Sequence, residues 1–281
     1  MLIFTFVWRF LRMVGRALTW ESDTRCEPFK NIKVLNFMEN EQPMMSIDTE
    51  TEWMRAQASI ERLEREGVSE KAFEPSGEIL CCMDEGTPMG DLRSAGSGIL
   101  TQGEERARFI AALKKAGVES VTSHEGCGAA ALYRERHGLT DKSVDEVAME
   151  GAKHLAAELG VPYGGHITEL ARPKGFHNAR VVYADGIGDF NPRKVESLPP
   201  GFVVSASVMT QEQAVSEVAL ALKIAFGEHG FGEKFTPAQP LVVVALGDEA
   251  LAAALQSAVG GEPRVKIVSF EPVVKTIQKA A

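Results

Sequence analysis

Residues 241–246 read LVVVAL, a run that is apolar at every position. A strand with one face in water alternates apolar and polar residues, whereas a strand covered on both faces does not. This run therefore predicts a buried strand of a parallel sheet. Similar strand-like runs occupy residues 79–83, 118–123, 179–184, 202–207 and 265–270.

Helix-prone segments separate these runs, and two of them have clear end signals. Ser143 and Glu146 have the spacing of a capping box, and Gly160 stops the helix that they begin. Residues 104–116 form another predicted helix, closed by Gly117. Strands that alternate with helices indicate an α/β fold with a mainly parallel sheet flanked by helices. We recognise no internal repeat or linker, so residues 46–281 are predicted to form a single α/β domain.

The first 45 residues differ in character from the rest of the chain. Arg9, Arg12 and Arg16 fall at helical spacing within an otherwise aromatic and aliphatic stretch. Three charges argue against a membrane span, and no secretory cleavage pattern is present. A membrane-surface helix, a targeting peptide and a wrongly assigned start codon remain open. We place residues 1–45 outside the fold and expect no membrane association unless this helix exists.

Charge and cysteine content exclude several functional classes. The chain of 281 residues has a formal net charge of −9 and no basic block, which argues against nucleic acid as a partner. Four cysteines in a chain of this length do not make a disulfide framework. We therefore expect a reducing, cytoplasmic setting, in which clustered cysteines serve metal binding or catalysis.

Two adjacent cysteines end the first strand-like run, but they are not equivalent. Because side chains alternate along a strand, Cys82 and Asp84 point to one face and Cys81 and Met83 to the other. We expect Cys81 to pack in the core as a small apolar residue. Cys82 lies near the carboxyl end of the strand, where open α/β sheets place their ligand sites.

The next strand-like run ends in a His and a Cys. Gly126 and Gly128 allow a tight backbone path around Cys127, so that His124 and Cys127 can converge on one ion. Together with Cys82 they form a Cys₂His set with a fourth position free, which suits a catalytic zinc better than a structural one. A structural or sensory metal site without catalysis stays open, with Cys26 or Asp84 closing the fourth position.

Three short motifs resemble the signatures of beta-class carbonic anhydrases, including the cadmium-type branch. They are Cys-Met-Asp at 82–84, Arg-Ser-Ala-Gly at 93–96 and His-Glu-Gly-Cys-Gly-Ala at 124–129. The resemblance covers residues 78–132. It implies a beta-carbonic-anhydrase-like fold, a homodimer or higher even oligomer, and Zn²⁺ as the cofactor, with Cd²⁺ or Co²⁺ as alternatives.

The same resemblance implies roles for individual residues. Cys82, His124 and Cys127 would be the metal ligands, and Asp84 the acid beside the activated water. In the family pattern C-x-D-x-R the Arg holds this Asp, but the corresponding position here is Gly86. We expect Arg93 to pair with Asp84 instead, which makes Asp84 and Arg93 the predicted catalytic residues.

These observations predict a metal-dependent carbonic anhydrase, which converts carbon dioxide and bicarbonate reversibly with the help of a metal-activated water. A hydrolase of carbon disulfide or carbonyl sulfide with the same ligand set is the closest alternative, and a non-catalytic zinc-binding protein is the other. His166, His177 and His229 lie near glycines in predicted loops. Each is expected to be a surface or packing histidine, and any one of them is a candidate for lining the pocket or for proton transfer. The motifs of zinc deaminases, P-loop proteins and G-x-S-x-G hydrolases are missing from the sequence.

Overall fold

The structure is a computed structural model that describes residues 48–74, 78–88, 90–247 and 249–270. The leader predicted at residues 1–45 lies outside the described residues. Within the described part of the chain, no helix is both long and apolar enough to cross a membrane.

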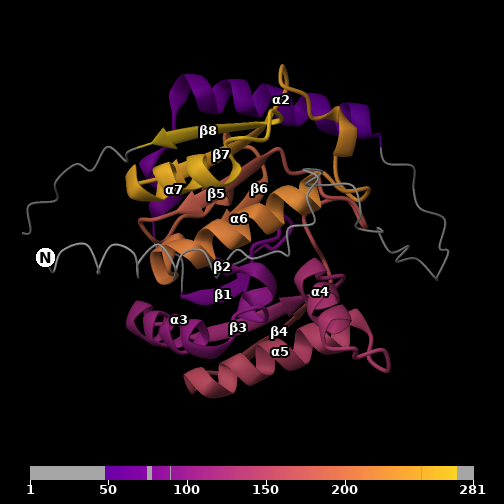
Figure 1. Ribbon diagram of the computed structural model, residues 1–281, viewed down its shortest axis with the longest axis vertical. Coiled ribbons are helices and arrows are strands. Elements are labelled where there is room, and N and C mark those ends of the chain that lie inside the picture. The colour runs from indigo at the N-terminus through magenta and orange to yellow at the C-terminus, as the bar shows by residue number, and fades with distance from the viewer. Residues whose placement is uncertain (1–47, 75–77, 89, 248, 271–281) are drawn as a thin grey trace, which may run out of the picture. The chain divides into compact units, whose positions relative to one another are not determined.

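The first sheet has four parallel strands in the order β2-β1-β3-β4 (Figure 1). Its strands are β1 (Ile79–Cys82), β2 (Leu92–Ser94), β3 (Ser120–His124) and β4 (Tyr163–Ile167). The helices that belong to this half are α3 (Gly103–Ala116), α4 (Gly128–Arg136) and α5 (Val144–Leu159).

The second sheet also has four parallel strands, in the order β6-β5-β7-β8. Its strands are β5 (Val181–Asp185), β6 (Gly201–Val204), β7 (Leu241–Leu246) and β8 (Val265–Phe270). The longer helices of this half are α2 (Thr49–Glu66), α6 (Gln211–Ala225) and α7 (Glu249–Val259). Five short 3₁₀ segments complete the described elements: η1 (Glu70–Phe73), η2 (Ala95–Gly98), η3 (Pro192–Lys194), η4 (Ala206–Val208) and η5 (Gly232–Lys234).

The predicted α/β class with parallel strands is confirmed, although the strands form two sheets. Strand β7 is buried at all six positions, as its continuous apolar run predicted. The capping box of α5 is present, and Gly160 and Gly117 end α5 and α3 in the left-handed conformation. Strands β2 and β4 were not predicted, because β2 is only three residues long and β4 is an edge strand that contains two glycines.

The two sheets repeat one topology. In each sheet the first strand in sequence lies between the second and the third, and the fourth lies outside the third. Strands β2 and β6 both lead directly into a 3₁₀ segment, through Ser94 and Ser205 respectively. The backbone N–H of Ser205 donates to the carbonyl of Arg93 at 2.9 Å, so β6 contacts β2 across the two halves.

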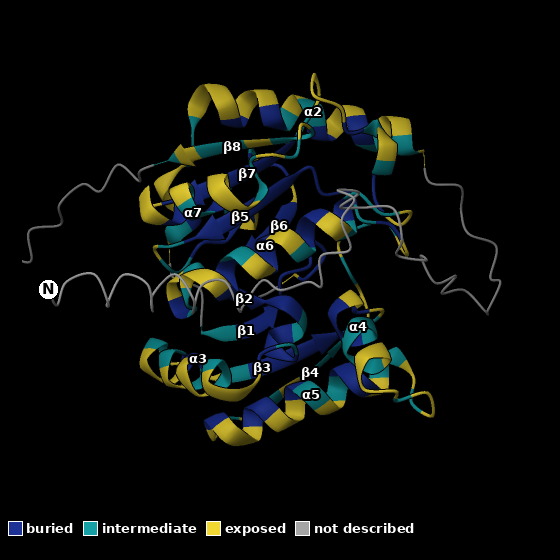
Figure 2. Ribbon diagram, in the orientation of Figure 1, coloured by how far each residue is buried: buried dark blue, intermediate teal, exposed yellow. Residues whose placement is uncertain are grey.

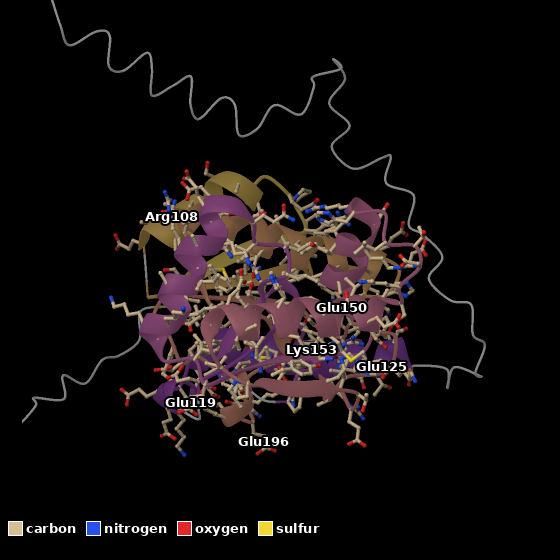
Figure 3. All side chains as sticks on the ribbon, turned by 90° about the horizontal axis from the view of Figure 1, so that it is seen from below. Arg108, Glu119, Glu125, Glu150, Lys153 and Glu196 are labelled. Carbon is tan, nitrogen blue, oxygen red and sulfur yellow. The ribbon has the colours of Figure 1, made fainter. Side chains whose placement is uncertain are left out.

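Apolar residues of both halves share one core cluster, which surrounds Cys82 and Cys127 and includes Val182, Phe202 and Val218. Figure 2 shows that buried residues concentrate in the strands and on the inner sides of the helices. Charged side chains such as Arg108 and Glu119 lie at the surface (Figure 3). The predicted ligand residues are therefore held in a tightly packed environment to which both halves contribute.

Candidate metal centre

The two sequence motifs meet at the carboxyl ends of neighbouring strands. Cys82 ends β1, His124 ends the adjacent parallel strand β3, and Cys127 is the N-cap residue of α4. One ligand atom from each of these three side chains lies within 4.8 Å of the other two. The structure therefore brings the predicted Cys₂His set together, and all three residues are buried.

The sulfur separation fits a tetrahedral metal ion. Two thiolates that each lie about 2.3 Å from a zinc ion at a tetrahedral angle are about 3.8 Å apart. The Sγ atoms of Cys82 and Cys127 are 4.0 Å apart. The separation of the two sulfurs is thus compatible with a divalent ion between the end of β1 and the N-terminus of α4.

The histidine presents the nitrogen that a metal ion requires. Nδ1 of His124 donates to the backbone carbonyl of Glu125 at 2.9 Å, which fixes the ring. Nε2 is buried and has no hydrogen-bond partner among the described residues. An orphaned buried nitrogen is costly unless a ligand satisfies it, and a metal-binding histidine commonly donates its other nitrogen in this way.

Backbone donors stabilise both sulfurs as thiolates. The N–H of Gly96 donates to Cys82 Sγ at 3.3 Å, from a turn with φ of 56° at Gly96. The backbone N–H groups of Ala129 and Ala130, in the first turn of α4, act to lower the pKa of Cys127. A helix N-terminus favours negative charge, so the position of Cys127 suits a metal-bound thiolate.

The two thiols shift each other's pKa in opposite directions. A hydrogen bond from Cys127 lowers the pKa of Cys82, and the same bond raises the pKa of Cys127. Burial lowers the pKa of His124, but the neighbouring Cys82 thiolate outweighs it and raises this pKa to about 9. Metal binding must therefore displace protons from Cys127 and His124.

Asp84 lies beside this centre and is held by Arg172, which follows β4. Nε of Arg172 donates to Oδ1 at 2.9 Å and Nη2 donates to Oδ2 at 3.0 Å. Both side chains are 5% exposed. Burial raises the pKa of Asp84, but the charges of His177, His124 and Arg172 outweigh it and hold this pKa well below its usual range.

Gly86 makes room for this arginine. A Cβ atom at Gly86 would lie 2.6 Å from Cγ of Arg172 and 2.9 Å from Oδ1 of Asp84. The backbone also ties the two segments together, since Ala171 N–H donates to the Gly86 carbonyl at 2.8 Å. Any larger side chain at residue 86, the position of the arginine in the C-x-D-x-R pattern, would therefore displace Arg172.

The expected ion pair between Arg93 and Asp84 is not formed. Arg93 donates instead to the hydroxyl of Thr87 and to backbone carbonyls, among them those of Asp84 at 3.3 Å and Gly90 at 3.2 Å. Its guanidinium supports the loop after β1, while the carboxylate of Asp84 faces Arg172. Arg93 lies on β2 beside Cys81 of β1, so its side chain reaches the backbone of the loop that follows β1 and not the Asp84 carboxylate.

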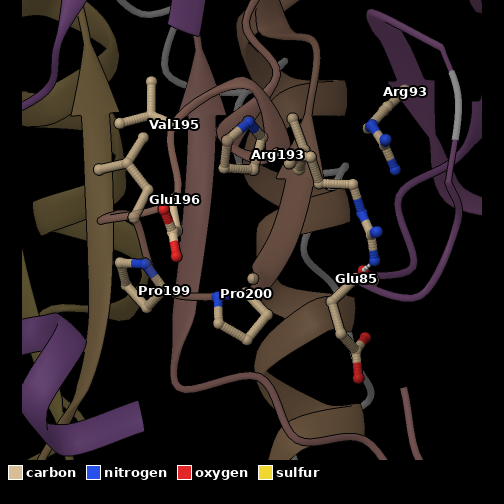
Figure 4. A pocket seen from close by; sticks show the side chains of 11 residues that line it. Glu85, Arg93, Arg193, Val195, Glu196, Pro199 and Pro200 are labelled. Atoms are coloured by element: carbon tan, nitrogen blue, oxygen red, sulfur yellow. Dashed lines mark hydrogen bonds between the residues drawn. The ribbon is translucent and has the colours of Figure 1, made fainter. Parts of the chain in front are cut away.

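Arg93 also lines a separate cavity of about 250 Å³ with Glu85, Arg193 and Pro200 (Figure 4). None of the three predicted metal ligands lines this cavity. The cavity is therefore distinct from the candidate metal centre.

A second polar group adjoins Asp84. Nδ1–H of His177 donates to both carboxylate oxygens of Glu85, at 3.1 and 3.2 Å, and lies 3.8 Å from Oδ2 of Asp84. Asp84, Glu85 and His177 satisfy the distance requirement of a metal site. The guanidinium of Arg172, only 3.9 Å from Glu85, opposes a second cation there.

The other sequence candidates take different places. Cys81 is fully buried, and burial raises its pKa, as expected for a core cysteine. His166 lies 2.8 Å from the hydroxyl of Ser123, and His229 is exposed. Cys26 lies outside the described residues, so its role as a fourth ligand stays a prediction.

The second half lacks the ligand set. Continuing the strand register places Asp185 where the first half has Cys82, and Gly247 where it has His124. The Asp185 carboxylate accepts the backbone N–H groups of Ile187 and Gly188, both at 3.0 Å. Asp185 thus closes its own loop, and within the described residues the Cys₂His set occurs once.

Comparison with known proteins adds no relative: no protein-family model, curated protein or solved structure matches the chain.

Proposed function

We propose that this protein is a metal-dependent carbonic anhydrase that hydrates carbon dioxide reversibly to bicarbonate. The observation that carries the proposal is the position of an ionised carboxylate, Asp84, beside a buried set of two cysteines and one histidine. Cys82, His124 and Cys127 would hold Zn²⁺, or alternatively Cd²⁺ or Co²⁺. When bound, such an ion supplies Lewis acidity that makes a water nucleophilic near neutral pH.

Asp84 orients this water in the proposed reaction. Oδ1 is occupied by the N–H of Gly86 at 2.7 Å and by Arg172, whereas the hydrogen bonds at Oδ2 come from Arg172 alone. A carboxylate oxygen has two acceptor directions. The single hydrogen on Nε of Arg172 lies closer to Oδ1 (2.9 Å) than to Oδ2 (3.2 Å), so Nη2 fills one direction of Oδ2 and the other is left for a hydrogen of the water. Because Arg172 keeps Asp84 ionised and fixed, Asp84 would hold the water by one hydrogen and leave its lone pair free to face the carbon of carbon dioxide.

The surroundings suit a small apolar substrate. Cys82 and Cys127 belong to an apolar cluster that also contains Met83, Phe176 and Phe202. Such surroundings exclude bulk water and strengthen the electrostatic effect of Asp84 on developing charge. The same property accommodates carbon disulfide or carbonyl sulfide, which are the closest alternative substrates.

The burial of the centre favours one rival proposal, a metal-binding protein without catalysis. Cys82 is 5% exposed, and His124 and Cys127 are each 1% exposed. The absorption spectrum of the cobalt-substituted protein separates the two proposals. A spectrum that changes with pH and with added anions indicates a position open to exchange and supports catalysis, whereas an inert spectrum indicates a closed structural site.

A further inference from the structure

The two halves contact each other reciprocally, in the manner of the two subunits of a symmetric dimer. In the N-terminal turn of α6, Gln213 donates through Nε2 to the Thr101 hydroxyl just before α3, at 3.0 Å. In the opposite direction, the Thr210 hydroxyl before α6 donates to Glu105 of α3 at 3.4 Å. Gln213 and Glu105 each lie three residues after the N-cap of their helix, while Thr101 immediately precedes the N-cap of α3 and Thr210 is the N-cap of α6, so the two contacts correspond to within one residue. Such reciprocity is the mark of a two-fold interface.

One contact between the halves breaks this reciprocity. Glu217, one turn further along α6, is 7% exposed and accepts from the Ser94 hydroxyl at 2.6 Å and from the Ala95 N–H at 2.9 Å. The corresponding residue of α3, seven positions after the N-cap, is Phe109. A buried carboxylate therefore reaches from the second half into the first, and none reaches back from this helix position.

The target of Glu217 is the turn that binds a metal ligand. Ser94 and Ala95 lead into the η2 turn, and the next residue, Gly96, donates its N–H to Cys82 Sγ. The Gly96 N–H can point at the sulfur only while this turn keeps its left-handed conformation, with φ of 56°. Glu217 fixes Ser94 and Ala95, the two residues that precede Gly96, with one hydrogen bond to each.

We propose that the second half acts as a partner subunit within the same chain, and that Glu217 is the residue through which it positions Cys82 for the metal ion. Glu217 is a positioning residue, because it acts through the backbone of Ala95 and Gly96 and does not reach the ion. The inference rests on the metal centre and is independent of the reaction that this centre performs.

The test is a comparison of metal affinity and spectrum between Glu217→Ala and the wild-type protein, with Zn²⁺ and Co²⁺ as probes. Loss of a residue that supports a metal ligand typically weakens binding 10- to 100-fold. We expect Glu217→Ala to weaken Zn²⁺ binding by about this factor and to shift the thiolate-to-cobalt absorption band. Glu217→Gln should restore most of the affinity, because its amide can accept from Ala95 and donate to the Ser94 hydroxyl.

Glu212→Ala is the matched control, since Glu212 is exposed on the same helix and should leave affinity and spectrum unchanged. Should Glu217→Ala fold poorly, Ser94→Ala removes one of the two hydrogen bonds and keeps the carboxylate, and a smaller shift of the cobalt band is expected. Wild-type zinc affinity together with an unshifted cobalt band in Glu217→Ala, or an unshifted band in Ser94→Ala, would overturn the proposal.

Discussion

Arg172 and Asp84, 88 residues apart in sequence, form a buried, doubly hydrogen-bonded ion pair beside the candidate metal centre. In the C-x-D-x-R pattern that the motif at residues 82–84 resembles, an arginine two residues after the aspartate would hold this carboxylate. Here that position is Gly86, which leaves room for Arg172 from the loop after β4 to hold Asp84 instead.

This pair predicts the effect of two substitutions. Arg172→Ala should leave metal content unchanged and lower the hydration rate about 100-fold, because a misplaced group near the reaction centre has an effect of this size. Loss of one partner from a buried ion pair should also cost about 3 kcal/mol of stability. Gly86→Ala should have the same consequence for the rate, since its Cβ would displace Arg172.

Lys174→Ala is the control for both variants, because Lys174 lies in the same loop and its side chain is 87% exposed. Zinc content, thermal unfolding and stopped-flow hydration are measured on all three proteins. Wild-type hydration rates in Arg172→Ala would show that Arg172 does not hold Asp84 for the reaction.

Metal content is predicted to be one ion per chain, since the second half has Asp185 and Gly247 in place of ligands. Cys82→Ser, His124→Ala and Cys127→Ser should each abolish binding, and Cys81→Ser should retain it. Elemental analysis of the purified proteins checks this prediction. Loss of metal in Cys81→Ser with retention in Cys82→Ser would show that the other thiol is the ligand.

The pH dependence of stability should reveal Glu217. Burial raises the pKa of Glu217 from 4.5 to about 7. Between these values the folded protein holds a proton that the unfolded chain releases, so the stability falls as pH rises through this window and then levels off. Across this window the ionisation of Glu217 lowers the free energy of unfolding by an amount on the order of 3 kcal/mol.

Glu217→Gln removes this titration. The difference in free energy of unfolding between Glu217→Gln and wild type should be more favourable to the variant at pH 8 than at pH 5. Urea unfolding of both proteins at both pH values measures this difference. Identical pH dependence in the two proteins would contradict a raised pKa for Glu217.

The parts of the site that depend on local sequence could be predicted. Cys82 and His124 end neighbouring apolar runs, and His124 and Cys127 are three residues apart, so strand alternation and parallel pairing suffice to bring them together. Arg172 could not be predicted, because its position depends on β4, an edge strand with no continuous apolar run, and on the space at Gly86. The lack of space for a side chain at Gly86 comes from Arg172, which is distant in sequence, so it becomes visible only in the folded structure.

The repeated topology of the two sheets could not be predicted from the sequence either. Corresponding positions of the two halves differ in chemistry, as Cys82 and Asp185 do. Cys82 belongs to a group that could hold a metal ion, whereas Asp185 closes a loop at the corresponding strand end. Similar strand order needs only similar burial patterns, and many apolar sequences provide these.

The repetition bears on assembly. The resemblance to beta-class carbonic anhydrases leads us to expect a homo-oligomer. If the second half of the chain acts as the partner of the first, however, metal binding should not require a second copy of the protein. Light scattering combined with metal analysis of each size fraction tests both expectations. A metal-free monomer beside a metal-loaded oligomer would show that another copy completes the centre.

The cytoplasmic location inferred from the cysteine content stays a prediction.

Stopped-flow hydration of carbon dioxide by the metal-loaded protein tests the central proposal most directly. We predict hydration that increases toward alkaline pH, because two thiolates donate more charge to the ion than imidazoles would and so acidify the water less. Asp84→Asn should keep the metal and lose about 100-fold in rate. Metal-loaded wild-type protein that hydrates no carbon dioxide at any pH would contradict the proposal, and hydrolysis of carbon disulfide by that same protein would assign the centre to the sulfur analogue.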